Sequence, residues 1–319
     1  MGAAALACAV LPALASDVIE AQKAQARGLE LHAQGEVAAA LREFERATAL
    51  APQAPLAWHN RGLARRQLRD CEGAVADFTR ALELAPKLFQ AWYQRGNCRQ
   101  VLGDYAAAVD DYTHALALPG QIHARFLAHF GRADAYRRLA RLDEAHADYS
   151  RVLELRRDTT ALRARAWVEA YRARWRQAHD DLARYLHETQ AKEPDAAHAV
   201  IMAVLALERI GESGAPLLEQ WQRFAAAAPW PAPVLRYLRG ELSEEELLDA
   251  AQGDGERTEA LAYAGSRRFA RGDQAGAVTL WTRVLREGNP AFLEYDLAYH
   301  ELRRLGAAQP DDRLRRGLP

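Results

Sequence analysis

Histidine and paired aspartate are the side chains of this chain that could carry acid–base or metal chemistry. Ten histidines occur in 319 residues, without a His-Glu-x-x-His, a Gly-x-Ser-x-Gly or a phosphate-binding glycine loop. His123 and His129 are close in sequence, but no cysteine or carboxylate stands at metal-ligand spacing beside them. We therefore predict a protein that is not an enzyme, has no catalytic residues and takes no cofactor and no metal.

A repeat of 34 residues decides where these side chains lie. Each unit has an early glycine, a later pair of alanines with an aromatic residue between them, and a closing proline, which is typical of repeated helix–turn–helix units. Asp110-Asp111 and Asp180-Asp181 then fall on second helices of separate units, where we expect them to face solvent. The recurring residues are Gly28, Gly62 and Gly96; Ala40, Ala74 and Ala108; Phe44, Phe78 and Tyr112; Ala47, Ala81 and Ala115; and Pro52, Pro86 and Pro119.

The third unit shows the pattern most completely. Trp92, Gly96, Gly103-Asp104-Tyr105, Ala108, Tyr112, Ala115 and Pro119 resemble a tetratricopeptide repeat, and the two units before it do so in register. The resemblance implies an all-α, right-handed superhelical solenoid of antiparallel helix pairs, closed by a C-terminal capping helix.

The organisation predicted along the chain loosens after residue 122. The solenoid spans 16–228, followed by a proline-containing linker and short helix at 229–257, where Pro229 to Pro233 are expected to be extended. A last unit with a capping helix occupies 258–306, and 307–319 is a tail. Ser243 and Glu246 fit a capping box in the short helix. The units fall near 21–54, 55–88, 89–122, 126–158 and 159–194, with a degenerate helix pair at 196–228.

In tetratricopeptide proteins the first helix of each unit lines a concave surface, so the resemblance implies a binding groove there. Large rings at Tyr93, Phe130, Trp167 and Tyr171 favour an extended peptide as its ligand over a bare polar surface. The Lys and Asn set of the family's dicarboxylate clamp is largely missing. The implied groove residues are His59, Asn60, Arg66 and Gln67; Gln90, Tyr93, Gln94, Asn97 and Gln100; Phe130, Asp134, Arg137 and Arg138; and Arg163, Trp167 and Tyr171.

The net charge of the chain and its N-terminal residues indicate which partners and which cellular location to expect. The net charge is −1 with interspersed signs, which gives no reason to expect nucleic acid as a partner. Residues 2–14 carry no charge and precede Ala13-Leu14-Ala15, which is typical of a signal peptide at 1–15. Cleavage would leave no integral membrane segment and predicts a secreted, periplasmic protein; an uncleaved, helical N-terminus would predict a cytoplasmic one.

Cys71 and Cys98 fall on neighbouring helices by the repeat register. Two readings stay open: two buried small hydrophobic side chains, or a disulfide in an oxidising compartment.

The combined prediction is a non-enzymatic scaffold or adaptor of the bacterial cell envelope that binds a protein or peptide partner. Residues 256–306, including Glu294-Tyr295, also resemble NlpI-type periplasmic tetratricopeptide proteins. The alternative is a self-associating protein that forms a homodimer through the degenerate units at 159–228 and the Trp-Pro segment.

Overall fold

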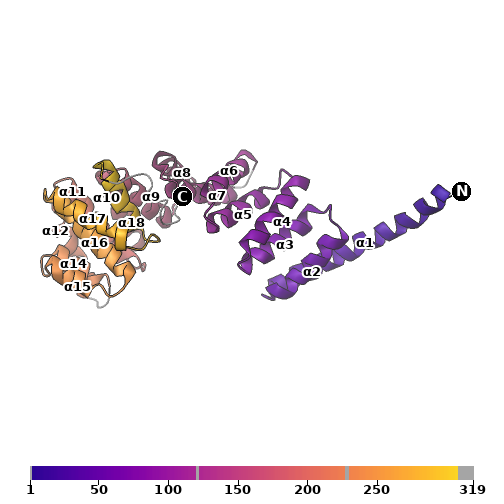
Figure 1. Cartoon of the computed structure of the whole chain (residues 1–319), viewed down its shortest axis with the longest axis horizontal. Coiled ribbons are helices and arrows are strands. Elements are labelled where there is room, and N and C mark those ends of the chain that lie inside the picture. The colour runs from indigo at the N-terminus through magenta and orange to yellow at the C-terminus, as the bar shows by residue number, and fades with distance from the viewer. Residues whose placement is uncertain (1, 120–121, 227–229, 308–319) are drawn as a thin grey trace. The chain divides into compact units, whose positions relative to one another are not determined.

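The computed structural model describes residues 2–119, 122–226 and 230–307, with side chains from residue 16. These residues form helices joined by turns, and no strand occurs among them (Figure 1). The predicted all-α fold is confirmed. The chain divides into two compact units, Met1–Leu139 and Ala140–Pro319, which we call unit 1 and unit 2.

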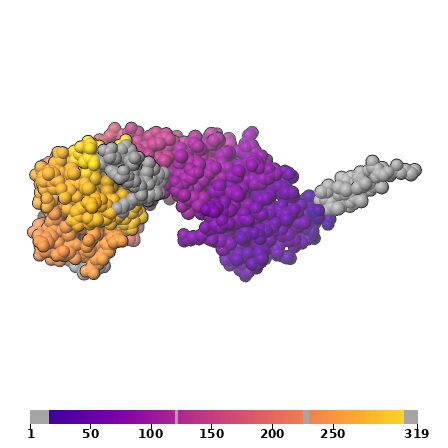
Figure 2. Space-filling model, in the orientation of Figure 1, coloured from indigo at the N-terminus to yellow at the C-terminus, as the bar shows by residue number. Residues whose placement is uncertain are grey.

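Unit 1 is a row of helices in which each packs against the next, so that successive helices form antiparallel pairs. The first helices of the pairs are also neighbours, since α1 contacts α3, α3 contacts α5 and α5 contacts α7. The side chains of this row form a closely packed body (Figure 2). The helices are α1 (Gly2–Ala33), α2 (Val37–Leu50), α3 (Pro55–Gln67), α4 (Cys71–Leu84), α5 (Phe89–Val101), α6 (Tyr105–Ala117) and α7 (Ile122–Arg138).

The recurring glycine and aromatic residue explain how closely the two helices of a pair approach. A Cβ atom added to Gly62 would lie 2.8 Å from Cε1 of Phe78, and one added to Gly96 would lie 2.9 Å from Cε1 of Tyr112. The rings are fully buried. Any larger residue at the glycine would therefore push the second helix away from the first.

The turn between the helices of a pair also follows from the sequence. Gly103 has φ +81°, which suits glycine, while the equivalent Arg69 adopts φ +68° with a side chain. The next residue caps the second helix: Asp70 accepts a hydrogen bond from the N–H of Gly73, and Asp104 from that of Ala107.

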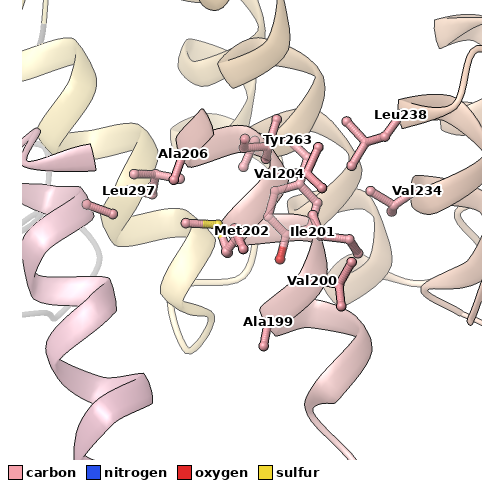
Figure 3. Close-up of a cluster of buried hydrophobic side chains, with 14 of the residues drawn as sticks. Ala199, Val200, Ile201, Met202, Val204, Ala206, Val234, Leu238, Tyr263 and Leu297 are labelled. Atoms are coloured by element: carbon pink, nitrogen blue, oxygen red, sulfur yellow. The ribbon is translucent and has the colours of Figure 1, made fainter. Parts of the chain in front are cut away.

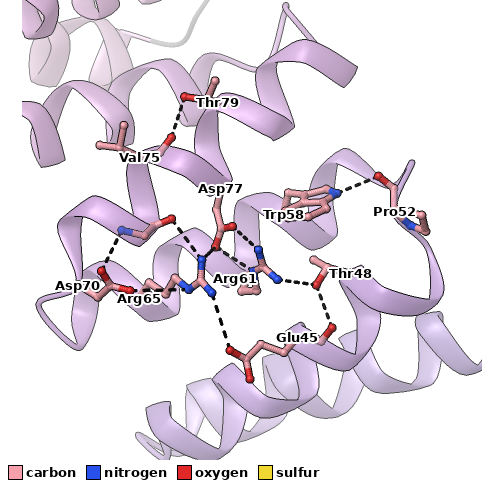
Figure 4. A network of polar contacts seen from close by, with 11 residues as sticks. Glu45, Thr48, Pro52, Trp58, Arg61, Arg65, Asp70, Val75, Asp77 and Thr79 are labelled. Atoms are coloured by element: carbon pink, nitrogen blue, oxygen red, sulfur yellow. Dashed lines mark hydrogen bonds and ion pairs between the residues drawn. The ribbon is translucent and has the colours of Figure 1, made fainter.

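Buried arginine–aspartate pairs hold each repeat together, and they correct one prediction. Arg61 Nε lies 2.9 Å from Asp77 Oδ2, and the same arginine reaches Thr48 of the preceding pair at 3.0 Å (Figure 4). Arg95 and Asp111 repeat this arrangement one unit later, at 2.7 Å. Asp110 and Asp180 are exposed, but Asp111 and Asp181 are only 1% and 8% exposed, and Asp181 pairs with Arg165 at 2.7 Å, so the expectation that both pairs face solvent was wrong for Asp111 and Asp181.

Unit 2 begins with helix pairs and ends as a cluster around α11. Ten residues of α11, from Ala196 to Ala206, are buried, as expected for a helix that is apolar on all sides. Helices α10, α12, α14 and α16 all contact it. Val234 and Leu238 of α14 and Tyr263 of α16 lie close to its side chains (Figure 3). The helices are α8 (Leu142–Leu155), α9 (Thr159–Tyr171), α10 (Trp175–Thr189), α11 (Ala196–Arg209), α12 (Ala215–Gln220), α13 (Arg223–Ala226), α14 (Ala232–Leu238), α15 (Glu244–Ala250), α16 (Asp254–Ala270), α17 (Gln274–Glu287) and α18 (Leu293–Arg304).

The C-terminal helix α18 lies against α9 as well as against α16 and α17. The Tyr171 hydroxyl of α9 donates a hydrogen bond to the carbonyl of Leu293 at 3.0 Å, and its ring stacks on His300 at 5.1 Å. Arg209 of α11 is paired with Glu301 of α18 at 2.9 Å, and both side chains are almost fully buried. The expected capping helix is thus also part of the core of unit 2.

Two further local expectations can be compared with the structure. The capping box of Ser243 and Glu246 at the start of α15 is confirmed. Helix α14 begins at Ala232, within the segment expected to be extended; Pro233 stands in its first turn, where no backbone N–H is required. None of the described helices is long and apolar enough to cross a membrane.

Candidate functional site

The A-helix face of unit 1, formed by α1, α3, α5 and α7, carries thirteen of the sixteen predicted groove residues. Arg66, Gln67 and Gln90 are exposed, and Asn60 and Tyr93 are half-buried. The side chains of Asn60, Gln90 and Tyr93 make no hydrogen bond with other residues that the structure describes. Their polar groups are therefore available to a ligand.

A chain of amide side chains on α5 is ordered by hydrogen bonds. The Tyr112 hydroxyl contacts Asn97 Oδ1 at 2.7 Å and Gln100 Oε1 at 3.1 Å. Asn97 Nδ2 donates to Gln94 Oε1 at 3.3 Å, and Gln100 Nε2 donates to the Gly131 carbonyl of α7 at 2.8 Å. These contacts fix the orientation of three predicted site residues, and fixed amides lose little entropy on binding a ligand.

The predicted residues on α7 are held by contacts within unit 1. Arg137 Nη2 lies 2.9 Å from Asp134 Oδ1, and Arg138 lies over the ring of Tyr105 on α6 at 5.7 Å. Phe130 is half-buried beside Phe126, with ring centroids 6.5 Å apart. Asp134 therefore offsets the positive charge of Arg137.

His59 was assigned wrongly to an exposed surface. Its side chain is 8% exposed and packs against Phe78 with ring centroids 5.6 Å apart. Burial lowers the pKa of His59 to about 4, so the ring is neutral at pH 7. His59 is a core residue of its repeat rather than a ligand-binding one.

Trp167 and Tyr171 were also assigned wrongly to an exposed surface. They are 5% and 3% exposed, because unit 2 packs its own helices over the inner side of α9. Arg163 is half-buried and pairs with Asp195 at 2.9 Å. The three predicted residues of the fifth repeat are therefore not part of an open face.

A cavity of about 240 Å³ lies within unit 2, and we call it the α9 pocket. Arg163 and Trp167 line it together with His198, Glu259 and Glu294, which the sequence analysis missed. No sequence signal could have found them, because these three residues come from α11, α16 and α18 and meet only through the packing of unit 2. The other lining residues are Leu182, Asp195, Ala199, Ala291, Phe292 and Leu293.

Two buried carboxylates dominate the electrostatics of the α9 pocket. Glu259 Oε2 accepts hydrogen bonds from His198 Nε2 at 3.0 Å and Trp230 Nε1 at 2.7 Å. Burial and the nearby charge of Glu259 raise the pKa of Glu294 to about 7, although a hydrogen bond from Tyr263 opposes the shift. Burial opposes a charge on His198, but the hydrogen bond to Glu259 and the nearby charges of Glu259, Glu294 and Asp195 together outweigh burial and raise the pKa of His198.

The structure bears on the cysteine and histidine expectations too. Cys71 and Cys98 are free, buried thiols of one hydrophobic cluster in unit 1. Burial and a hydrogen bond with Cys71 raise the pKa of the Cys98 thiol to about 12. His129 is buried, whereas His123 is exposed. Within the described parts of the chain, no three His, Cys, Asp or Glu side chains are grouped so as to hold a metal ion.

Comparison with known sequence families identifies the repeats. A tetratricopeptide repeat model matches residues 26–89 and 59–121, and another matches residues 127–159. The chain therefore contains tetratricopeptide repeats, as predicted. Such repeats generally act as interaction modules without enzymatic activity. Comparison with curated proteins gave no match.

Solved structures share the helical solenoid fold at low sequence identity. PilF of Pseudomonas aeruginosa is 12% identical with a TM-score of 0.54, over 71% of this chain and 100% of that chain. YrrB, described as a TPR protein with an unusual peptide-binding site, is 19% identical with a TM-score of 0.52, over 62% and 98% of the two chains. A tetratricopeptide repeat protein from Parabacteroides merdae is 16% identical with a TM-score of 0.51, over 89% and 99%.

Proposed function

We propose that the protein is an adaptor that binds an extended segment of a partner protein on the A-helix face of unit 1. One observation carries the proposal. Helices α3 and α5 combine polar side chains that have no hydrogen-bond partner among the described residues with amide side chains that hydrogen bonds already hold in place. Asn60, Gln90 and Tyr93 supply the free groups, and Gln94 and Asn97 belong to the ordered amides.

An extended peptide suits this combination chemically. Each residue of such a peptide presents an N–H and a C=O group, and amide side chains can both donate to and accept from them. The Tyr93 ring, stacked on Phe89 at 6.5 Å, offers an apolar surface for one side chain of the partner. The tetratricopeptide repeats of the chain give general support for a protein partner.

A selection experiment tests this proposal without knowledge of the natural partner. A phage-displayed library of random dodecapeptides is selected on the full-length protein, and the enriched peptides are measured by fluorescence anisotropy. We expect the double variant Asn60→Ala, Tyr93→Ala to lose at least about tenfold in affinity, since aromatic anchors carry much of such binding energy. The control Glu83→Ala removes an exposed side chain from the second helix α4, away from the A-helix face, and should bind normally. Equal affinity of the double variant and the unaltered protein would exclude this face as the binding site.

The location that we propose is the cell envelope, after removal of residues 1–15. The support is the uncharged stretch at 2–14, followed by small residues at 13 and 15. N-terminal sequencing of the protein from the native cell tests it: a mature chain that begins at Ser16 agrees, and an intact N-terminus in the cytoplasm contradicts it.

Self-association is the second candidate, and one surface of unit 2 favours it. A cavity of about 460 Å³ is lined by apolar groups that include Leu186, Leu217 and Trp221. Trp221 is half-buried beside Phe224, with ring centroids 6.1 Å apart. Light scattering after size-exclusion chromatography decides the matter, because a monomer at micromolar concentration rules out this homodimer.

A further inference from the structure

The α9 pocket of unit 2 is a partly open site with its own chemistry, separate from the A-helix face of unit 1. Its volume of about 240 Å³ is below the roughly 300–1,000 Å³ of sites that take drug-sized ligands. It can hold one side chain or one small molecule. Ligand binding in the α9 pocket is therefore independent of the peptide binding proposed for unit 1.

Glu259 is the group in the pocket with a carboxylate oxygen left open to a ligand. The residue is 6% exposed, and both of its hydrogen bonds, from His198 and Trp230, end on Oε2. Its second oxygen, Oε1, accepts no hydrogen bond from any residue that the structure describes. Because this oxygen is open to the pocket, a positively charged ligand there can donate a charge-assisted hydrogen bond to it.

The charges around Glu259 make the pocket negative when Glu294 is ionised. Asp195 is neutralised by Arg163 at 2.9 Å, so this pair adds no net charge. Glu294 adds a second, partly protonated carboxyl group, and His198 is the remaining source of positive charge. A cation is therefore the ligand that the pocket favours.

The walls of the pocket favour a cation that carries an apolar stem. Trp167 and Phe292 provide aromatic surface, and Leu182 and Ala291 provide aliphatic surface. Such walls pack against methylene groups, and aromatic faces attract a positive charge. We propose that the α9 pocket binds a primary alkylammonium group, as carried by a lysine side chain or by an aliphatic diamine.

Other cations fit the geometry less well. A guanidinium group binds carboxylates through two parallel hydrogen bonds, but Oε2 of Glu259 is already occupied by two donors. A quaternary ammonium group has no N–H to donate to Oε1. A metal ion would need several ligands, and the described residues show no group of three suitable side chains.

Binding of the cation is coupled to proton release. A positive charge in the pocket lowers the pKa of Glu294 and of His198, so protons leave the protein near pH 7. Several titratable and charged groups surround Glu294. They are Tyr263 and Glu259 on α16, His198 on α11, Asp195 just before α11, and Arg163 and Tyr171 on α9.

Isothermal titration calorimetry on the full chain tests the proposal with Nα-acetyl-lysine methylamide and 1,4-diaminobutane. The probe Nα-acetyl-norleucine methylamide, which lacks the ammonium group, serves as the ligand control. We expect saturable binding of at least one amine and none of the norleucine derivative. Tighter binding of the lysine derivative would assign the ammonium to a partner protein, and tighter binding of the diamine to a free small molecule.

Three variants complete the test. Glu259→Gln should weaken amine binding at least tenfold, whereas Glu245→Gln, at an exposed position of α15, should leave it unchanged. Ala291→Trp fills the exposed mouth of the pocket and should block both amines even if Glu259→Gln fails to fold. Repeating the titration at pH 7 in buffers of different ionisation enthalpy should show proton release, reduced in Glu294→Gln. Absence of amine binding, or binding that survives Ala291→Trp, would overturn the proposal.

Discussion

Units 1 and 2 use the same kind of helix pair but treat its inner side differently. In unit 1 the first helices α3 and α5 keep Asn60, Gln90 and Tyr93 at the surface. In unit 2, α9 is the first helix of its pair, and its Trp167 and Tyr171 are buried beneath helices from later in the chain. A repeat signature thus predicts the pair of helices, while the exposure of its inner side depends on what the rest of the chain packs there.

The cause of the difference lies in α11, α16 and α18. Helix α11 is apolar on nearly every side, so it must be surrounded, and α10, α12, α14 and α16 pack around it, while α18 packs against α9 and α16. The regular helices of unit 1 need only their neighbours, which they contact through small residues and buried arginine–aspartate pairs. Helices α9 and α10 of unit 2 keep one such pair, Arg165 and Asp181.

The variant expected to have the largest effect is Glu301→Ala, which attacks the closure of unit 2. Loss of Glu301 leaves the buried charge of Arg209 without its partner, which destabilises proteins by about 3–5 kcal/mol. Urea unfolding at pH 7 measures the change in the free energy of unfolding. The control Glu287→Ala breaks the exposed pair with Arg283 and should change it by less than about 1 kcal/mol. Equal losses would mean that the Arg209–Glu301 contact does not hold α18 in place.

The next largest effect is a difference in pH dependence between the two units. Burial lowers the pKa of His59, so between about pH 6.5 and 4 the unfolded chain binds a proton that the folded chain does not. Unit 1 therefore loses stability as the pH falls through this window, by up to about 3 kcal/mol from this residue.

The opposite sign is expected for Glu294 in unit 2. Its raised pKa means that the folded state holds a proton between about pH 4.5 and 7 that the unfolded state has released, so stability falls as the pH rises. Urea unfolding of the unaltered protein, His59→Gln and Glu294→Gln across pH 4–7 measures both. The differences from the unaltered protein should slope in opposite directions, and parallel slopes would refute the assignment.

A smaller effect is expected from Gly62→Ala, which tests the close packing of unit 1. The added methyl group would lie 2.8 Å from the buried Phe78 ring, and overpacking of this kind destabilises by about 1–3 kcal/mol. Thermal unfolding measures it. The matched control is Gly253→Ala in unit 2, where an added Cβ meets nothing within 4 Å and φ is ordinary. If both variants melt alike, the glycine is not a packing requirement.

The smallest effect is expected from Asp104→Ala, which removes the cap of α6. The Asp104 carboxylate accepts the N–H of Ala107 at 3.2 Å, and loss of such a cap is worth about 1 kcal/mol. Hydrogen exchange should quicken in the first turn of α6 and stay unchanged in α4, which keeps its own cap at Asp70. Uniform quickening across unit 1 would show that the cap has no local role.

The sequence allowed the helices of unit 1 to be predicted because Gly, Ala and aromatic residues recur there at fixed spacing. The arginine–aspartate pairs were missed, although Arg61 and Arg95, like Asp77 and Asp111, recur at the same interval and could have been found. The wrong assignment of His59 shows that a position expected on the A-helix face can instead be buried against the second helix of its pair. Trp167 and Tyr171 could not be assigned correctly, because α18 lies far from α9 in sequence and only folding brings them together.

The most direct test of the difference between the units is hydroxyl-radical footprinting of the full chain, read by mass spectrometry at Tyr93 and Tyr171. Tyr93 is half-buried on the A-helix face, and Tyr171 is 3% exposed under α18. We predict ready oxidation of Tyr93 and protection of Tyr171, with protection lost in Glu301→Ala. Oxidation of Tyr171 at the rate of Tyr93 in the unaltered protein would contradict the account.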